Sequence, residues 1–318
     1  MTTAVIKNLN VKYASKKGIL GKPETVCAVN NLSLDIKKGE ILAIAGESGC
    51  GKSTLAKAII GLEPASSGEI IFNDVDVVNM NKLEIQDFRK KVQMIFQNPY
   101  ASLNPKMRIK DILAEPLKIN SKLTQTEIEN KIKDTLSKVG LNEEVLDLYP
   151  HEFSGGQRQR IAIARALVLD PEFILADEPV SALDVSIQAQ IINLLKDLKQ
   201  NFNLTILFIS HDLSVIKYLA DRVAIMYLGE IVELGTVNDV FYSPAHPYTK
   251  ALLASVPKFS SDNVEKIELE GDLPSPSNLP LGCKFHTRCH YCMPSCKDIQ
   301  PNETRLSDSH YVKCLLHS

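Results

Sequence analysis

The 318-residue sequence contains no long apolar run. A membrane-spanning helix needs about 18 or more consecutive apolar residues. The most apolar stretches, 161–169 and 204–209, are far shorter than that. Residues 1–8 also lack the basic segment and following apolar segment of a secretory signal. We therefore expect a cytosolic chain that has no membrane span of its own.

The sequence also lacks an excess of charge of either sign. Its 36 Lys and Arg residues against 38 Asp and Glu residues give a formal net charge of −2 at pH 7. A general attraction to nucleic acid or anionic lipid would need such an excess. With 44% hydrophobic and 23% charged residues, the composition is that of a globular protein with a sizeable core.

Cysteine is scarce in the body of the chain, where only Cys27 and Cys50 occur before residue 283. The other five cysteines lie within the last 36 residues. A secreted, disulfide-stabilised domain would not be joined to a long body that is poor in cysteine. The crowded cysteines therefore need another explanation.

The apolar patterning predicts an α/β body. Alternation over 3–12 and 26–36 favours half-buried antiparallel strands, because their side chains face two different environments. Continuous apolar runs at 39–45, 173–177 and 205–210 favour buried parallel strands.

The rest of the chain shows helical patterns that are interrupted by proline and glycine. We expect a helix over 53–60, a mostly helical stretch over 106–170 broken at Pro116, Gly140 and Pro150, and a helix over 187–199. Residues 68–80 read as a strand or hairpin, 222–234 alternate again, and a proline-rich tail follows. With no internal repeat, the body is predicted to be one α/β domain with a helical insertion and a C-terminal extension.

Residues 46–53 fit the pattern G-x-x-x-x-G-K-S/T at every fixed position, between a predicted strand and a predicted helix. That context is the one this phosphate-binding motif requires. Its glycines let backbone N–H groups face an anion, and the helix N-terminus adds positive potential. Lys52 would reach the β- and γ-phosphates, and Ser53 would bind Mg²⁺. The predicted nucleotide-binding segment comprises Gly46, Glu47, Ser48, Gly49, Cys50, Gly51, Lys52, Ser53 and Thr54.

An acidic pair, Asp177 and Glu178, ends the predicted strand at 173–177. Two adjacent acids at the end of a buried strand are unfavourable unless they face a ligand site. Together with the phosphate-binding loop, the pair predicts that Asp177 holds Mg²⁺ through water. Glu178 would polarise the attacking water.

The segment Phe153-Ser154-Gly155-Gly156-Gln157-Arg158, just before this acidic strand, resembles the signature of ATP-binding cassette (ABC) ATPases. A serine before two glycines can cap a helix and expose its first N–H groups to a second anion. In this family two ATPases form a head-to-tail dimer, and the signature of one contacts the γ-phosphate bound by the other. The resemblance thus implies nucleotide contacts from Ser154, Gly155, Gly156 and Gln157.

Four further residues match elements of the same family. Gln97 resembles the Q-loop glutamine, which contacts Mg²⁺ or water and relays to the membrane partner. Asp184 resembles the D-loop aspartate that bridges the dimer, and His211 the switch histidine near the γ-phosphate. Tyr13 would stack on adenine. Gln97, Glu178 and His211 are therefore the implied catalytic residues.

The resemblance covers residues 1 to about 240 with no motif missing. It implies a P-loop NTPase core of the ABC ATPase type, with an antiparallel β subdomain and a helical subdomain at about 98–170. The implied reaction converts ATP and water to ADP and phosphate, with Mg²⁺ as cofactor and with catalysis by positioning and charge stabilisation. Residues 241–318 would form a small, irregular C-terminal extension.

The extension narrows the resemblance to one branch of the family. Its start, Pro244-Ala-His-Pro-Tyr248-Thr-Lys-Ala-Leu-Leu, resembles ATPase subunits of oligopeptide, dipeptide and nickel importers. Segments 271–276 and 282–289 resemble their second, F-type subunit. This implies a heterodimer with another ATPase beneath two membrane permease subunits at the cytoplasmic face of a bacterial cell membrane. An extracytoplasmic binding protein would deliver the substrate.

The helical segment would then dock a permease helix near the Q-loop. Tyr100, Leu103 and Met107 suit such a docking surface, but they suit a core equally well.

The tail cysteines favour metal or cluster ligation in a reducing compartment. In the importer subunits resembled here, four cysteines bind a 4Fe–4S cluster, and their pattern matches Cys283, Cys289, Cys296 and Cys314. Cys292 is then surplus. Zinc, which more often uses paired tight cysteine spacings, and free or disulfide-linked thiols remain alternatives.

We expect an ATPase that powers the uptake of oligopeptides or dipeptides. A nickel or metal-chelate importer remains an alternative, because an ATPase subunit does not touch the cargo. A soluble ABC ATPase acting on nucleic acid or ribosomes would usually carry two cassettes or a long coiled-coil insertion, which are not seen here. A tail that senses metal or redox state is a third possibility.

Overall fold

The computed structural model describes residues 2–16, 23–98, 102–256 and 271–318. The chain divides into two compact units that are each discontinuous in sequence. The first takes its residues from 37–41 and 79–209. The second takes its residues from 2–36, 42–78 and 210–318.

The first unit contains three parallel strands, β6 (Val92–Ile95), β7 (Phe173–Asp177) and β8 (Thr205–Ile209). β7 lies between the other two, and every residue of β7 and β8 is buried. The predicted buried strands are thus confirmed. β6 was not predicted, because four residues after a charged helix carry too little pattern.

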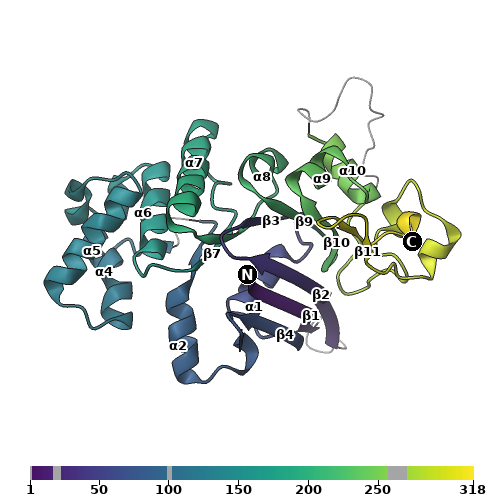
Figure 1. Cartoon of the computed structure of the whole chain (residues 1–318), viewed down its shortest axis with the longest axis horizontal. Coiled ribbons are helices and arrows are strands. Elements are labelled where there is room, and N and C mark those ends of the chain that lie inside the picture. The colour runs from purple at the N-terminus through teal and green to yellow at the C-terminus, as the bar shows by residue number, and fades with distance from the viewer. Residues whose placement is uncertain (1, 17–22, 99–101, 257–270) are drawn as a thin grey trace. The chain divides into compact units, whose positions relative to one another are not determined.

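Helices make up the rest of the first unit. They are α2 (Lys82–Lys91), α4 (Ile109–Asn120), α5 (Gln125–Lys138), α6 (Gly155–Leu167) and α7 (Val185–Phe202), with 3-10 turns at Glu143–Asp147 and Pro150–Glu152. Figure 1 shows α4, α5 and α6 (teal) in mutual contact. These three helices lie within the helical insertion predicted at about 98–170.

The predicted helix break at Pro116 is wrong, because α4 continues through Pro116 to Asn120. A proline inside a helix removes a backbone hydrogen bond and costs about 3 kcal/mol. The apolar face of α4, which includes Ile109, Leu113 and Leu117, is buried in the contact with α5 and α6 and offsets this loss. The predicted stop at Gly140 is confirmed by its left-handed backbone (φ 69°) after α5.

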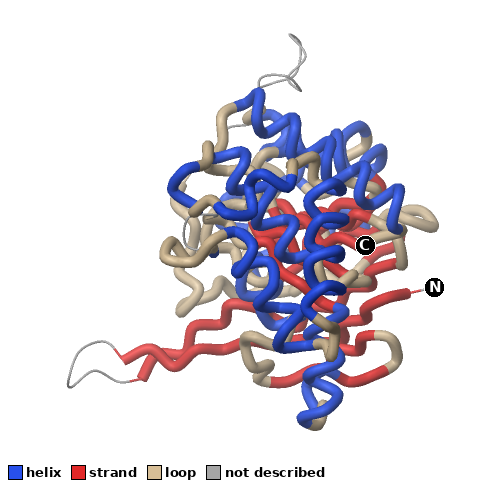
Figure 2. Tube along the Cα trace, turned by 90° about the vertical axis from the view of Figure 1, so that its left-hand side faces the viewer, coloured by secondary structure: helices blue, strands red, loops and turns tan. Residues whose placement is uncertain are grey.

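The second unit contains an antiparallel sheet in the order β2-β1-β4-β5, comprising β1 (Thr2–Lys16), β2 (Pro23–Lys37), β4 (Ser67–Phe72) and β5 (Val75–Asp76). β1 and β2 are the two long strands that run side by side into the undescribed residues 17–22 in Figure 2. The predicted antiparallel β subdomain and the hairpin after residue 67 are confirmed.

A second set of strands in this unit has the order β11-β12-β10-β9-β3. It consists of β3 (Ile41–Ala45), β9 (Arg222–Tyr227), β10 (Glu230–Thr236), β11 (Thr304–Arg305) and β12 (Tyr311–Val312). β3 pairs with β9 in parallel, whereas β9 and β10 form a hairpin. Its turn uses left-handed backbone at Leu228 and Gly229.

The helices of the second unit are α1 (Lys52–Ile59), α8 (Leu213–Leu219), α9 (Val237–Tyr242) and α10 (Pro247–Ala254), with 3-10 turns at Val77–Asn79, which begins in this unit, His286–Arg288, Pro294–Lys297 and Leu315–His317. Within the described part of the chain, no helix is long and apolar enough to cross a membrane.

The C-terminal extension is built into the second unit. β12 pairs with β10, and Figure 1 shows this part of the chain (yellow) beside β10 and α10. Glu233 of β10 is buried and accepts hydrogen bonds from the backbone N–H groups of Ala245 and His246 and from the His310 ring (2.7 Å). One buried carboxylate thus ties two segments of the extension, around residues 245–246 and 310, to the sheet.

This carboxylate and His310 make the stability of the unit depend on pH. Burial alone would raise the pKa of Glu233, but the hydrogen bonds from His310, Ala245, Thr249 and His246 outweigh it and lower the pKa below the ordinary 4.5. The hydrogen bond to Glu233 raises the pKa of His310 above 6.5. The carboxylate's contribution is lost as pH falls through its lowered pKa, and the imidazolium's is lost as pH rises through its raised pKa.

We therefore predict that His310→Gln lowers the free energy of unfolding most between about pH 4.5 and pH 6.5, and progressively less above that window. Urea unfolding of both proteins across pH 4–9 measures the difference. His151→Gln, at an exposed position, is the matched control. A difference that is the same at every pH would contradict the assignment.

Candidate functional site

The phosphate-binding loop lies between β3 and α1 in the second unit. β3 is a fully buried Ile-Leu-Ala-Ile-Ala strand that ends at Ala45. The helix predicted over 53–60 is present as α1, which begins at Lys52 with Gly51 as its N-cap and is followed by Gly61 in left-handed conformation. The strand–loop–helix context that the motif requires is therefore present.

At two positions of the loop only glycine fits, because there is no room for a Cβ atom and because the backbone conformation favours glycine. A Cβ on Gly46 would lie 2.2 Å from the carbonyl oxygen of Met226, and one on Gly51 would lie 2.1 Å from that of Ala28. Gly51 also has φ 107°, which L side chains rarely adopt. Any side chain at these positions would push the loop away from β9 or β2.

Lys52 is buried, and its ammonium is directed back into the loop. Its Nζ donates hydrogen bonds to the carbonyl oxygens of Gly46 and Glu47, both at 2.8 Å, and lies 3.7 Å from Cys50 Sγ. A buried cation is tolerated only with such partners. The lysine is thus pre-positioned where the loop wraps around an anion.

Three other predicted site residues, Tyr13, Ser53 and His211, belong to the same unit. Tyr13 on β1 is about one-third exposed, and its hydroxyl hydrogen-bonds the side chain of Thr54, in the first turn of α1. Burial raises the pKa of Tyr13, and the hydrogen bond with Thr54, which lowers it, only partly offsets this effect. Ser53 is exposed on the first turn of α1, and His211 is exposed just before Asp212, the N-cap of α8.

The first unit holds the acidic pair. Asp177 is the last residue of β7 and is 7% exposed, and Glu178 follows in a left-handed backbone conformation (φ 45°). Such a conformation is unfavourable for glutamate and is found preferentially at functional sites. Gln97 Nε2 donates a hydrogen bond to Glu178 Oε2 at 2.9 Å, so the structure brings these two predicted residues together.

The predicted helix cap at Ser154 is confirmed. Ser154 Oγ accepts from the backbone N–H of Gln157, and Gln157 Oε1 accepts from the N–H of Ser154, which together form a capping box at the start of α6. Gly156 packs so closely on α7 that a Cβ would lie 2.4 Å from Ile187 Cγ2. Asp184 is exposed at the N-cap of α7.

The predicted docking residues do not all lie on the surface. Leu103 is only 2% exposed and belongs to the core, whereas Met107 is half-buried. Tyr100 lies outside the described residues. Leu103 therefore cannot contribute to a docking surface.

The tail cysteines all lie in the second unit and have no disulfide bond among the described residues. Burial, with smaller contributions from neighbouring cysteines, raises the pKa of Cys283 and Cys289 to about 11. In the described part of the chain, no group of three or more His, Cys, Asp and Glu side chains is arranged to hold a metal ion. The structure therefore does not support the predicted cluster.

Sequence reasoning missed two residues that contact the phosphate-binding loop. Tyr248 Oη accepts a hydrogen bond from the N–H of Glu47 (2.9 Å), and Arg288 forms an ion pair with the Glu47 carboxylate (3.0 Å). Both residues stood in motifs of the extension. Nothing local in the sequence connects them to a loop some 200 residues earlier.

A phosphate-binding loop after a buried parallel strand, a strand that ends in two acids and a capped serine–glycine–glycine helix define an ATPase of the ABC class. Residues 29–181 match the family model of the ABC transporter, and residues 232–296 match that of the oligopeptide/dipeptide transporter C-terminal region. The chain belongs to the ABC transporter family, and it is an ATP-binding, ATP-hydrolysing member of it.

Curated relatives are similar over nearly the whole chain. The oligopeptide transport ATP-binding protein AppF of Bacillus subtilis is 51% identical over 92% of this chain and 90% of its own length. The oligopeptide transport ATP-binding protein OppF of Salmonella typhimurium is 49% identical over 98% and 95%. The dipeptide transport ATP-binding protein DppF of Haemophilus influenzae is 48% identical over 95% and 93%.

Solved structures confirm the fold class. The ATP-binding cassette MJ0796, a dimer bound to ADP and phosphate, superposes with a TM-score of 0.65 at 30% identity, over 74% of this chain and 98% of that one. CbiO1 from Clostridium perfringens, part of the transporter complex cbiONQ, gives 0.66 at 29% identity over 76% and 91%. The predicted P-loop NTPase core of the ABC type is therefore correct.

We predict that Glu178→Gln keeps MgATP binding within about twofold of the parent protein but lowers hydrolysis by about 10²–10⁴-fold, since an amide cannot accept the proton of the attacking water. Phosphate release and nucleotide titration measure the two quantities separately. Glu172→Gln, at the exposed residue that precedes β7, is the control. Near-parental hydrolysis in Glu178→Gln would remove this residue from its role.

Proposed function

We propose that the chain is the ATPase subunit that powers peptide uptake by an ABC importer. The observation that carries this proposal is the match of residues 232–296 to the C-terminal region of oligopeptide and dipeptide transporters. This region lies beyond the residues that match the general ABC transporter model, and its own match is to a narrower class of transporters. The names of the curated relatives, which are oligopeptide and dipeptide transport ATP-binding proteins, support the same cargo class.

We propose that residues 1–240 form the nucleotide-binding domain and 241–318 the extension. In this assignment Lys52 and residues 46–54 hold the phosphates, and Tyr13 stacks on adenine. Ser53, Gln97 and Asp177 would hold Mg²⁺, which neutralises charge on the β- and γ-phosphates when bound. Their hydroxyl, amide and carboxylate oxygens are the kinds of ligand that this hard cation prefers.

The catalytic work then falls to Glu178, supported by Gln97 and His211. Glu178 accepts a proton from the attacking water, and the 2.9 Å hydrogen bond from Gln97 orients its carboxylate. His211 stabilises the charge that develops on the γ-phosphate. Because an acceptor for that water must be held still, the hydrogen bond between Gln97 and Glu178 is the contact that most supports these roles.

We propose further that the working form is a heterodimer with a second, homologous ATPase under two permease subunits, at the cytoplasmic face of the cell membrane. The serine–glycine–glycine start of α6 supports a dimer, because a helix N-terminus favours an anion, and this one is separate from the chain's own phosphate-binding loop. Asp184 would bridge the two ATPases, and helices of 98–170 would contact a permease. The binding protein would act only indirectly.

Purification of the tagged chain from detergent-solubilised membranes tests this assembly. We predict that two permease subunits and a second ATPase co-purify in equal amounts, and that the cognate binding protein carries peptides, as identified by mass spectrometry. A nickel or metal-chelate cargo would retain the importer role and overturn the peptide assignment. Co-purification with nucleic acid or ribosomes, without permeases, would contradict both.

We propose that Cys283, Cys289, Cys296 and Cys314 bind a 4Fe–4S cluster that holds the extension in shape. Their spacing in the sequence supports this. The partly buried thiols of Cys283 and Cys289, whose pKa values are raised, would have to lose their protons to bind the cluster. Cys292 is exposed and would not be a ligand.

We predict about four iron atoms and four acid-labile sulfides per chain after anaerobic purification. Each of the variants Cys283→Ser, Cys289→Ser, Cys296→Ser and Cys314→Ser would lose most of the iron, whereas Cys292→Ser, the matched control, would retain it. Zinc without sulfide, or neither metal, would overturn the cluster.

A further inference from the structure

Glu47, the first variable residue of the phosphate-binding loop, is held at three points. Its backbone N–H donates to Tyr248 Oη at 2.9 Å. Its carboxylate accepts hydrogen bonds from Arg288 Nη1 at 3.1 and 3.0 Å, one to each oxygen. Its carbonyl oxygen accepts from Lys52 Nζ at 2.8 Å. The first two partners come from the C-terminal extension, and the third is the loop's own phosphate-binding lysine.

The ion pair between Arg288 and Glu47 is largely shielded from water. The Arg288 side chain is 6% exposed and that of Glu47 is 25% exposed. An exposed ion pair contributes little, but removal of one partner from a shielded pair leaves the other charge uncompensated. This contact therefore constrains the loop more than a surface pair would.

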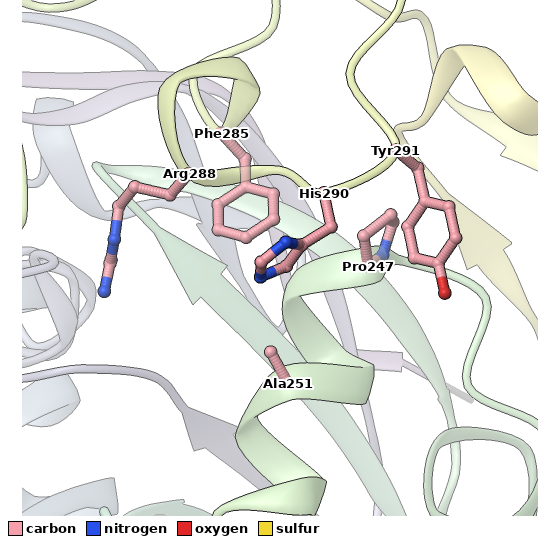
Figure 3. Close-up of a pocket in the computed structure, with 6 residues that line it drawn as sticks. All are labelled: Pro247, Ala251, Phe285, Arg288, His290 and Tyr291. Carbon is pink, nitrogen blue, oxygen red and sulfur yellow. The ribbon is translucent and has the colours of Figure 1, made fainter. Parts of the chain in front are cut away.

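Tyr248 and Arg288 are themselves held rigidly. Tyr248 is fully buried on α10, with its ring centroid 4.7 Å from that of Tyr227 and 5.3 Å from that of Phe285. Its backbone N–H donates to Nδ1 of His246, whose pKa burial lowers to about 4, so that the ring accepts. Figure 3 shows Phe285 and Arg288 on the same turn of the extension, with the Arg288 side chain extending away from Pro247 and Tyr291.

The far end of the loop has its own anchor. The backbone N–H of Gly229, in the turn between β9 and β10, donates to the carbonyl oxygen of Cys50 at 2.8 Å. The loop is thus fixed at Cys50 by the sheet of its unit and at Glu47 by the extension. The N–H groups of this loop must all point at the phosphate oxygens, so the loop would bind phosphate more weakly if one of its ends could move.

We propose that Tyr248 and Arg288 are positioning residues for the phosphate-binding loop, through which the C-terminal extension sets the affinity for ATP. Neither residue touches the reacting atoms. They act through Glu47, whose carbonyl oxygen binds the same ammonium that binds phosphate. Loss of either contact releases the carbonyl and the ammonium together, so it weakens nucleotide binding more than it slows the chemical step.

The test is a set of variants compared for MgATP binding and for turnover. Arg288→Gln removes the ion pair, Glu47→Gln removes it from the other side, and Tyr248→Phe removes one hydroxyl while keeping the aromatic packing. Titration with a fluorescent N-methylanthraniloyl derivative of ATP gives the dissociation constant of the full chain. Phosphate release from the assembled transporter gives KM and kcat.

We expect each single variant to raise the dissociation constant and KM about three- to tenfold, with kcat changed less than about twofold. The double variant Arg288→Gln/Glu47→Gln should bind no more weakly than the worse single variant, because both remove one interaction. Arg288→Lys, which keeps the charge, should recover part of the affinity.

Arg305→Gln is the matched control, since it breaks an exposed pair with Asp308 (2.6 Å) in the same extension. It should leave KM unchanged. Parental affinity in Tyr248→Phe and Glu47→Gln, or equal losses in Arg305→Gln and Arg288→Gln, would overturn the proposal. If Arg288→Gln does not fold, Tyr248→Phe and Glu47→Gln decide the matter alone.

Discussion

The buried ammonium of Lys52 is the constraint on which the rest of this molecule depends. A buried cation needs hydrogen-bond acceptors. Here they are the carbonyl oxygens of Gly46 and Glu47, in the same loop as Lys52. The loop can fold back on the lysine only because Gly46 and Gly51 leave room against Met226 and Ala28. The sheet and the helix are arranged to hold this short turn.

The C-terminal extension belongs to that support. Glu233 binds two of its segments, and the aromatic contacts of Tyr227, Tyr248 and Phe285 fix its approach to the loop. The part of the chain that matches the oligopeptide/dipeptide transporter C-terminal region is therefore in direct contact with the phosphate-binding loop. On our proposal, changes in the extension alter the affinity for nucleotide without any change in the phosphate-binding motif.

Local chemistry in the sequence predicted most of the site. The phosphate-binding loop, the acids that end β7 and the cap at Ser154 depend on residues within a few positions of each other, so their patterns are readable. The Arg288–Glu47 ion pair was not predictable, because it joins residues 241 positions apart. The helix break predicted at Pro116 was wrong for a related reason, because the tertiary burial of α4 outweighs the local preference of proline to end a helix. Whether Leu103 belongs to the core or to a docking surface could not be decided from its apolar side chain alone; tertiary packing buries it.

The central claim is that Lys52 and Glu47 act together: the extension holds Glu47 in place, and Glu47 positions Lys52 to bind the phosphates. A crystal structure of the assembled transporter with MgATP, carrying Glu178→Gln to prevent turnover, tests it most directly. We predict that Lys52 Nζ lies within hydrogen-bond distance of β- and γ-phosphate oxygens while Glu47 keeps its contacts with Arg288 and Tyr248. Nucleotide bound in this loop with Glu47 released from both residues would contradict the account.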